Sequence, residues 1–266
     1  MIALDAVGVT RAGHKLLDGV SLAFEPGRVT VIVGPNGAGK STIVKLASGE
    51  LMPSAGMVTL DGLPLPRVNA RALALRRAVL AQSSDAVFGF TVRELATLGA
   101  RLLGFGAPPG DHVERALHLV GLVALADRPI DRLSGGERQR AHLARVLVQL
   151  WVSAKLHGPG ALLLDEPIAA QDLSQQLRVL EIARQHAATG GAVGIVLHDL
   201  NWAAHIADHL VALHRGRIYA QGAPATVLTQ RMLAEVYGVD LEPGAVPDRI
   251  FLLPQLAAFR PDGSGL

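Results

Sequence analysis

A glycine-rich segment directly after a short apolar run constrains the fold of this chain more than any other feature. The segment Gly34-Pro35-Asn36-Gly37-Ala38-Gly39-Lys40-Ser41 matches the pattern G-x-x-x-x-G-K-[ST] of a phosphate-binding loop. The run before it, Val29–Val33, is typical of a buried strand, and Ile43–Ser48 after it has helical spacing. Strand, glycine loop and helix in this order predict an α/β fold with a nucleotide site at the end of the strand.

The residue types of this loop suit phosphate chemistry. Its glycines let the backbone curl so that several N–H groups point inward, Lys40 supplies a positive charge for the β- and γ-phosphates, and Ser41 supplies a hydroxyl for Mg²⁺. The candidate ATP-binding residues of the loop are Gly34, Pro35, Asn36, Gly37, Ala38, Gly39, Lys40, Ser41 and Thr42. A glycine turn with an incidental lysine is the alternative, which the flanking strand and helix disfavour. The motif alone does not separate a kinase, a GTPase and a transport ATPase.

Two adjacent carboxylates follow a second apolar run. Leu162–Leu164 leads directly into Asp165, Glu166 and Pro167, so both acids are expected at the carboxyl end of a buried strand, where ligands bind in open α/β sheets. Asp165 is then placed to join the Mg²⁺ shell, and Glu166 to act as general base for an attacking water. A lone acid would more simply cap the next helix, but a pair in this context favours catalysis.

A third motif, Leu133-Ser134-Gly135-Gly136-Glu137, lies between the other two. Ser134 and Glu137 have the S-x-x-E spacing of a capping box, which predicts that a helix begins at Gly135. A cap does not require two glycines, because glycine weakens a helix. Glycines at a helix N-terminus do let a ligand approach the backbone. Both capping and phosphate binding are therefore expected of this motif.

These three motifs and a later histidine, His198, occur in the order found in ATP-binding-cassette (ABC) ATPases, which the chain resembles over residues 1–240. The LSGGE string is highly specific to that family among proteins with such a phosphate loop. The resemblance implies an α/β fold with a P-loop NTPase (RecA-like) core, an N-terminal antiparallel β subdomain and an inserted α-helical subdomain. It divides the chain into a catalytic core (1–82 and 161–240), a helical subdomain with the signature motif (83–160) and a C-terminal tail (241–266).

The same resemblance implies roles for single residues. Ser134, Gly135, Gly136 and Glu137 would face the γ-phosphate of an ATP that the partner subunit's phosphate loop holds. Gln82 would link Mg²⁺ and the attacking water to the membrane partner, His198 would contact the γ-phosphate, and Asp172 would cross the dimer interface. The expected catalytic residues are thus Glu166, His198 and Gln82, and the expected Mg²⁺ ligands are Ser41, Gln82 and Asp165.

The chain also departs from the family pattern. Ile168 stands where Ser or Thr is common, and Gln171 stands where Leu is common. The aromatic residue that stacks on adenine is missing, and Arg11 occupies its position. A guanidinium plane can stack on a base, so Arg11 is the candidate for this contact. The alternative is that Arg11 is a solvated turn residue, with His14 or nothing covering the base.

Several segments narrow the resemblance to the ATPases of metal-chelate importers, and within them to haemin import. Two segments are similar to the metal-chelate group as a whole, His198–Asn201 and Tyr219–Pro224. Three look most like haemin import proteins, namely Ser48–Leu51, Gln82–Ser84 with Phe90–Val92, and Gln149–Trp151 with an inserted stretch Val152–Gly160. None of these residues touches cargo in such systems, so haem follows from resemblance alone. Import of a siderophore or cobalamin, and a soluble ABC ATPase without transport, are the alternatives.

The resemblance also implies partners and a location. It implies a homodimer that binds two transmembrane permease subunits, acts indirectly with a periplasmic binding protein and lies at the cytoplasmic face of the inner membrane. Phe88 and Phe90, which flank Gly89 in an expected loop, are expected to be exposed and to meet a permease helix; the alternative is that both rings pack inward. No nucleic-acid partner is expected, because 25 basic and 23 acidic residues leave a net charge of only +2.

Composition fits this interpretation. Hydrophobic residues make up 50% of the chain, yet no apolar stretch approaches the roughly 18 residues of a spanning helix, and no signal peptide is evident. The absence of cysteine agrees weakly with a reducing compartment. Further expected strands are Ile2–Val9, Val20–Phe24, Met57–Leu60 and Val193–Leu197, with a hairpin over 209–220. Further expected helices are Val92–Leu103, Val113–Val120, Gly135 to about Trp151, and Leu173–Ala188, with a loop over Ser153–Gly160.

Overall fold

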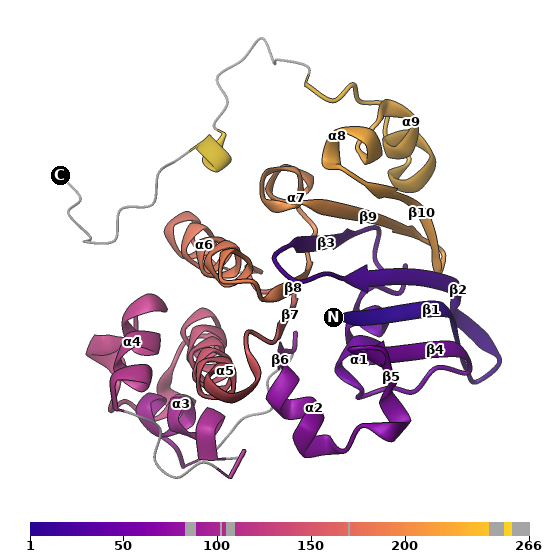
Figure 1. Ribbon diagram of the computed structural model, residues 1–266. Coiled ribbons are helices and arrows are strands. Elements are labelled where there is room, and N and C mark those ends of the chain that lie inside the picture. Colours follow the sequence, from indigo (N-terminus) through magenta and orange to yellow (C-terminus); the bar gives the residue numbers. More distant parts are fainter. Residues whose placement is uncertain (83–88, 102, 105–109, 170, 245–252, 257–266) are drawn as a thin grey trace.

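Two β-sheets form the centre of the computed structural model, which describes residues 1–82, 89–101, 103–104, 110–169, 171–244 and 253–256 (Figure 1). An antiparallel sheet has the order β2–β1–β4–β5, and a larger sheet has the order β10–β9–β3–β8–β7–β6, parallel except for β10. The strands of the first are β1 (Ile2–Arg11), β2 (His14–Phe24), β4 (Ala55–Leu60) and β5 (Leu63–Pro64). Those of the second are β3 (Val29–Val33), β6 (Arg77–Leu80), β7 (Ala161–Asp165), β8 (Ala192–Val196), β9 (His209–His214) and β10 (Arg217–Gly222).

The central strands of the larger sheet are continuous apolar runs because both faces of the sheet are covered. Every residue of β3, β7 and β8 is buried. Successive side chains of a strand point to opposite faces, so Val31 joins one hydrophobic cluster and Ile32 the other. The cluster of Ile32 also contains the antiparallel sheet, and the cluster of Val31 contains the long helices. The larger sheet is therefore the middle layer of the molecule.

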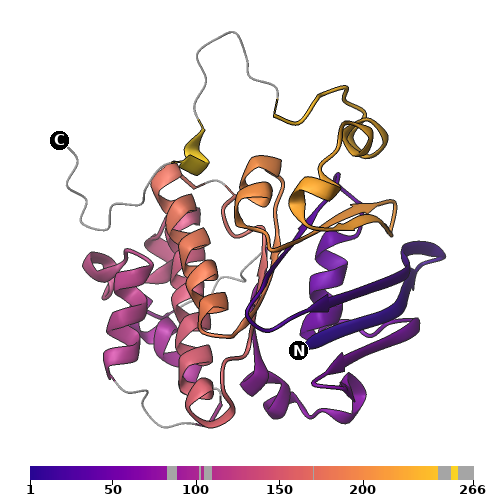
Figure 2. The ribbon, with the colours of Figure 1, turned by 45° about the horizontal axis from the view of Figure 1, so that its top comes forward.

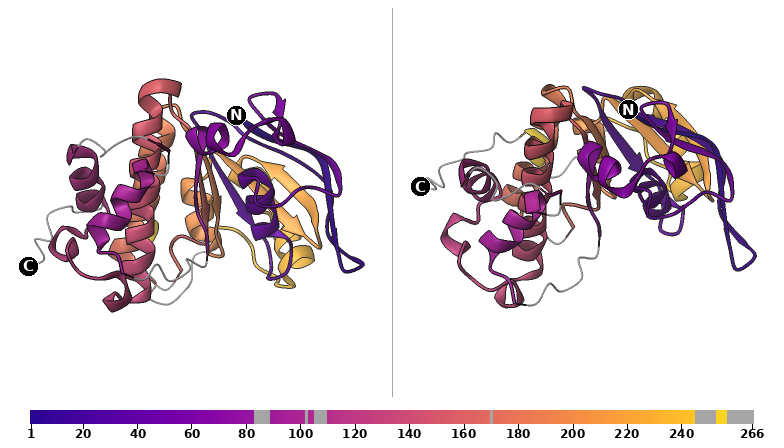
Figure 3. Two further views of the ribbon diagram at one scale, coloured as in Figure 1. Left: turned by 90° about the horizontal axis from the view of Figure 1, so that it is seen from below. Right: turned by 60° about the horizontal axis from the view of Figure 1, so that its bottom comes forward.

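Helices cover both faces of this sheet (Figure 2). Helix α1 (Lys40–Ser48) packs on the side of the antiparallel sheet, whereas α5 (Gly135–His157), α6 (Leu173–Ala188) and α7 (Leu200–Ile206) pack on the other. Helices α3 (Val92–Arg101) and α4 (Gly110–Leu119) lie against α5. In Figure 3 these magenta helices lie on the opposite side of the molecule from the indigo strands. The short helices are α2 (Ala70–Arg76), α8 (Pro224–Val227) and α9 (Gln230–Met232), the last continued by a π-helical turn, Leu233–Tyr237.

The expected strands and helices are present, but one expected loop is wrong. Helix α5 does not end near Trp151 and continues to His157. Ser153 fits inside the helix because its Oγ donates a hydrogen bond to the carbonyl of Gln149, one turn earlier (2.8 Å). The helix ends only at Gly158, whose φ of 71° breaks it. Helices α2, α7, α8 and α9 and strands β5 and β6 were not predicted, and all of them are short.

The expected permease contact is only partly described. Phe88 lies outside the described residues, and Phe90 is half-buried and packs against the large hydrophobic cluster. For Phe90 the packing agrees with the alternative that the ring turns inward. None of the helices in the described ranges is long and apolar enough to span a membrane.

Candidate nucleotide site

The glycine loop joins the end of β3 to the start of α1, and its backbone admits only glycine at two positions. Gly34 has φ 152° and Gly39 has φ 105°. A β-carbon on Gly34 would lie 2.2 Å from the carbonyl oxygen of Leu213, and one on Gly39 would lie 2.9 Å from that of Leu16. The sequence motif is thus a consequence of how tightly the loop packs against β9 and β2.

The loop presents donors to an anion. Gly39 is the N-cap of α1 and has no side chain to accept from the first amides of the helix, so these amides are available to phosphate oxygens. Lys40 is 5% exposed, and its Nζ donates to the carbonyls of Gly34 (2.9 Å) and Pro35 (3.0 Å). Burial lowers the pKa of Lys40, while the nearby carboxylates of Glu166 and Asp165 oppose this shift. The ammonium group of Lys40 is therefore already held at the loop where it is expected to contact phosphate.

Ser41 and Asp165 meet beside the loop. The hydroxyl of Ser41 donates to Oδ1 of Asp165 at 3.2 Å. Asp165 ends β7 and is 4% exposed, and burial raises the pKa of its carboxyl group, an effect that the hydrogen bond from Ser41 opposes. A hydroxyl and a carboxylate oxygen are ligands that Mg²⁺ prefers, usually together with substrate phosphates and water. The donor set therefore fits the expected metal ion.

Both carboxylate oxygens of Glu166 are engaged. Nε2 of Gln82 donates to Oε2 at 2.8 Å, and Nε2 of His198 lies 2.5 Å from Oε1. These three residues follow β6, β7 and β8, which are neighbours in the sheet, so the fold brings their side chains to one edge. The expected catalytic residues thus form one hydrogen-bonded cluster.

The backbone of Glu166 is held by a residue that was not expected at the site. Glu166 has φ 52°, in the left-handed region, and its carbonyl accepts a hydrogen bond from Nε2 of Gln139 (3.1 Å). Gln171 donates to Oε1 of Gln139 and to the carbonyl of Pro167, both at 2.9 Å. We call this pair the glutamine bridge. Its only signal in the sequence is Gln171 in a position where the family commonly has Leu.

The start of α5 is built as expected. Oγ of Ser134 accepts from the amide of Glu137 (3.3 Å), and Oε2 of Glu137 accepts from the amide of Ser134 (2.8 Å). The hydrogen bonds from Ser134 lower the pKa of Glu137. A cavity of about 320 Å³ joins this helix start to the catalytic cluster, and it is lined by Gln82, Gly135, Gly136, Arg138, Gln139, Glu166 and Ala169.

Two expected site residues stand apart from this cluster. Arg11 is exposed at the end of β1, opposite His14 across the hairpin turn, and its guanidinium makes no hydrogen bond or ion pair with a described residue. Asp172 is exposed and caps α6, accepting from the amide of Gln175 (3.0 Å) and the hydroxyl of Ser174 (2.8 Å). Arg11 is expected to stack on the base of a nucleotide, and Asp172 is expected to contact a second subunit. Both roles therefore involve groups outside this chain.

Comparison with known proteins places this site in a family. The sequence profile described as "ABC transporter" matches residues 17–169, more than half of the chain. The chain belongs to the ABC transporter family. It is an ATPase of that family, and the expected α/β P-loop fold is confirmed by solved ABC cassettes.

Relatives of this ABC ATPase share its full length. It is 47% identical over 260 residues, 97% of this chain and 99% of the relative, to "Hemin import ATP-binding protein HmuV" of Chelativorans sp. (strain BNC1). A protein of the same name from Rhizobium meliloti (strain 1021) is 44% identical over 97% of this chain and 99% of its own. Among solved structures, an ATP-binding subunit of an ABC transporter has a TM-score of 0.76 at 22% identity, covering 92% of this chain and 95% of that one.

Proposed function

We propose that this ABC ATPase powers the import of haem across the inner membrane. The assignment of haem as the cargo rests on sequence identity of 42–47%, over nearly the whole length, to proteins from several bacteria that are named for hemin import. The chemistry is the hydrolysis of ATP to ADP and phosphate, and the cluster around Glu166 supports it. Residues 1–82 and 161–240 form the catalytic core in this proposal, residues 83–160 form the helical subdomain, and 241–266 form a tail.

ATP binds first to the glycine loop. The backbone amides of residues 34–42 and the ammonium group of Lys40 hold the β- and γ-phosphates. Lys40 exchanges its present partners, the carbonyls of Gly34 and Pro35, for phosphate oxygens. Mg²⁺ would be held by Ser41 and Asp165, with Gln82 at its edge, and would neutralise charge on the phosphates. The plane of Arg11 would cover the base.

Hydrolysis then depends on freeing Glu166. His198 now holds Oε1 of Glu166, and a γ-phosphate is the competing partner for the same imidazole. Once His198 turns to the phosphate, Oε1 can accept a proton from a water molecule. The water oxygen bonds to the γ-phosphorus as the bond to the β–γ bridging oxygen breaks, which yields ADP and phosphate. Gln82, on Oε2, orients the carboxylate.

The assembly in this proposal is a homodimer with two bound ATP molecules. The Ser134–Gly136 backbone of one subunit faces the γ-phosphate on the other, and Asp172 lies at their interface. The dimer binds two permease subunits at the cytoplasmic face of the inner membrane, with a periplasmic binding protein acting from the other side. The open helix start at Gly135, where a β-carbon would meet nothing within 4 Å, leaves room for a phosphate.

Transport in vivo tests the cargo. A strain without this chain should lose growth on haemin as its only iron source, and the parent chain should restore growth whereas Glu166→Gln should not. Growth on a ferric siderophore and uptake of cobalamin should stay unchanged in the same strain. If haemin use persists and siderophore or cobalamin uptake fails instead, the cargo is not haem.

A further inference from the structure

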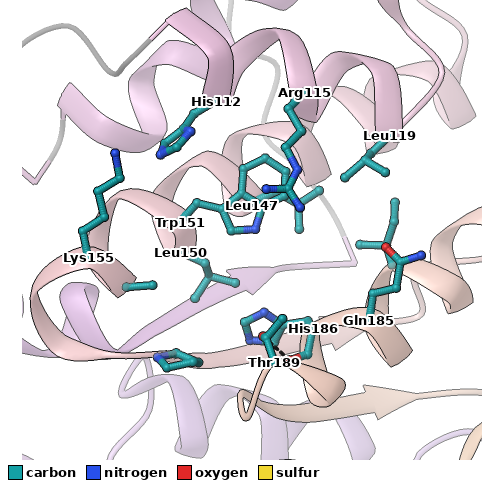
Figure 4. A pocket seen from close by; sticks show the side chains of 13 residues that line it. His112, Arg115, Leu119, Leu147, Leu150, Trp151, Lys155, Gln185, His186 and Thr189 are labelled. Carbon is teal, nitrogen blue, oxygen red and sulfur yellow. Dashed lines mark hydrogen bonds between the residues drawn. The ribbon is translucent and has the colours of Figure 1, made fainter.

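A second cavity lies far from the nucleotide site. It has a volume of about 390 Å³, opens to solvent and lies between α4, the second half of α5 and the end of α6 (Figure 4). Its apolar wall includes Leu147, Leu150 and Trp151 from α5 and Ile182 from α6, with Leu119, Ala154 and Pro159 beside them. Small-molecule sites in proteins have about this volume and this kind of lining. The cavity is therefore large enough for an organic ligand with an aromatic ring.

Two cations stand at the rim of this cavity. The guanidinium of Arg115 lies over the ring of Trp151, 4.6 Å from its centre, and Lys155 projects from the next turn of α5 (Figure 4). Neither side chain forms an ion pair within the described part of the chain. None of the described residues lining the cavity is acidic. The charge of the rim is thus complementary to an anion.

The two histidines of the cavity leave this charge pattern unchanged. Burial lowers the pKa of His112, and Lys155 and Arg115 lower it further, against the influence of Asp111, which lies 3.7 Å away. Burial also lowers the pKa of His186, whose Nε2–H donates to the carbonyl of Gly160 at 2.9 Å. Burial therefore favours the neutral form of both rings. Arg115 and Lys155 therefore carry the positive charge that faces the cavity.

The cavity and the nucleotide site lie at opposite ends of α5. This helix begins beside Ser134 at the candidate phosphate contact and has 23 residues, so its two ends are about 34 Å apart. Lys155 belongs to the stretch Val152–Gly160, whose first residues extend α5 beyond Trp151 to His157. A ligand in this cavity would not compete with the nucleotide.

We propose that this cavity binds a flat aromatic carboxylate. The ring packs against Trp151 and the leucines of α5, and the carboxylate lies between Arg115 and Lys155. A guanidinium that already stacks on an indole is oriented for a planar, charge-assisted contact. A phosphate would use the two cations but not the apolar wall, and a neutral aromatic would use the wall but not the cations. Only a ligand with both parts uses the whole site.

Calorimetric titration of the full-length chain tests this inference, with 2-naphthoate as probe and neutral 2-naphthamide as its matched control. We expect one naphthoate to bind per chain, about tenfold or more tighter than naphthamide, with the same affinity in the presence of ATP. Arg115→Gln and Lys155→Gln should each weaken naphthoate binding by about fivefold or more. Arg67→Gln removes the same charge from an exposed position outside the cavity and should leave the affinity unchanged.

Three results would overturn the inference. Equal affinity for naphthoate and naphthamide would show that the two cations do not contribute to binding and that the cavity selects only for apolar surface. Unchanged naphthoate affinity in both cavity variants would place the anion elsewhere, and competition by ATP would place it at the glycine loop. Unfolding temperatures of all variants equal to that of the parent ensure that a lost signal reports lost binding. A variant that fails this control is replaced by Trp151→Leu, which keeps both cations and should still lose binding.

Discussion

Glu166 combines a constrained backbone with a fully engaged side chain. A left-handed conformation costs a residue other than glycine about 1–3 kcal/mol, and such residues concentrate at functional sites. Here φ is 52°, and the carbonyl is held by Gln139 and by the amide of Ala169. The conformation aims the carboxylate at Gln82 and His198, so the position of the proposed base is fixed before any nucleotide binds.

Glu166→Gln tests that base. The amide is the same size and still bonds to its neighbours, but it cannot accept the proton from water. We expect turnover to fall by about two to four orders of magnitude while ATP binding is retained. Measurements of phosphate release and of equilibrium ATP binding check both parts. Lys40→Ala is the contrasting variant, because it should weaken ATP binding itself. Turnover near the parent rate in Glu166→Gln would remove the assignment.

Gln171→Leu tests the glutamine bridge. Leu is the common family residue at this position, and the change removes the hydrogen bond from Gln171 to Gln139 together with the one to the carbonyl of Pro167. We expect kcat to fall about three- to tenfold with little change in KM for ATP, since one buried hydrogen bond contributes about 0.5–1.5 kcal/mol. Gln139→Leu should have a similar effect, and the double variant should be no worse than either single variant.

The control for the bridge is Gln230→Leu. Gln230 is exposed in α9, and its side chain bonds only to Asp240 among the described residues, so its replacement should leave kcat unchanged. If the two bridge variants combine additively, they act independently, and the bridge does not position Glu166 as a unit.

Arg11 tests how the base is held. Stacking uses the face of a base rather than its hydrogen-bonding edges, so GTP should be accepted almost as well as ATP. Arg11→Ala should weaken the binding of either nucleotide by about 1–3 kcal/mol, and Arg11→Tyr should preserve it. Nucleotide affinities of the three proteins decide the matter. Equal affinity for the parent and Arg11→Ala would make Arg11 a solvated turn residue.

Among the elements, the sequence predicts best those whose pattern is local. Strand β3 has the predicted bounds because its apolar run ends at a glycine. Helix α6 has the predicted bounds because Asp172 caps the start of a stretch with helical periodicity. The end of α5 was missed because Ser153 reads as a loop residue in sequence but bonds within the helix. The glutamine bridge could not be predicted, since it joins side chains 32 residues apart that only the packed sheet brings together.

The start of α5 allows a test that separates stability from function. Gly135 is the first residue of α5, and a β-carbon there would meet nothing within 4 Å, so Gly135→Ala should stabilise the helix by at most about 0.5–1 kcal/mol and raise the melting temperature by at most about 1–3 °C. The same methyl group would stand where the partner's γ-phosphate is expected, so ATPase activity should fall at least about tenfold. Thermal unfolding and phosphate release measure the two effects.

Gly99→Ala is the matched comparison for Gly135→Ala. Gly99 also lies in a helix, α3, but its β-carbon would lie 2.2 Å from the carbonyl oxygen of Arg145. This variant should lose stability and keep its activity per folded molecule. If Gly135→Ala behaves like the parent in both measurements, the glycine serves neither the helix nor a phosphate.

At the scale of the whole molecule, a single chain supplies the glycine loop and the catalytic cluster of the proposed site. In our proposal, the group that faces the γ-phosphate opposite the glycine loop is the Ser134 segment of a second subunit. The glycine loop, Asp165, Glu166 and His198 gather at the ends of neighbouring strands. The Ser134 helix start borders the catalytic cluster of its own chain across the cavity of about 320 Å³, and α3 and α4 pack against the same helix. In a two-fold dimer each site would take its loop from one subunit and its Ser134 segment from the other.

Mixing two inactive variants tests this arrangement directly. Glu166→Gln lacks the base, whereas Ser134→Asp keeps a helix cap, since Asp caps well, but sets a negative charge against the phosphate. A mixed dimer then has one site with two defects and one site with none. Random mixing gives mixed dimers about half the time, so activity should recover to about a quarter of the parent value. If Ser134 serves the ATP on its own chain, every site keeps one defect, and the mixture should be as inactive as its components.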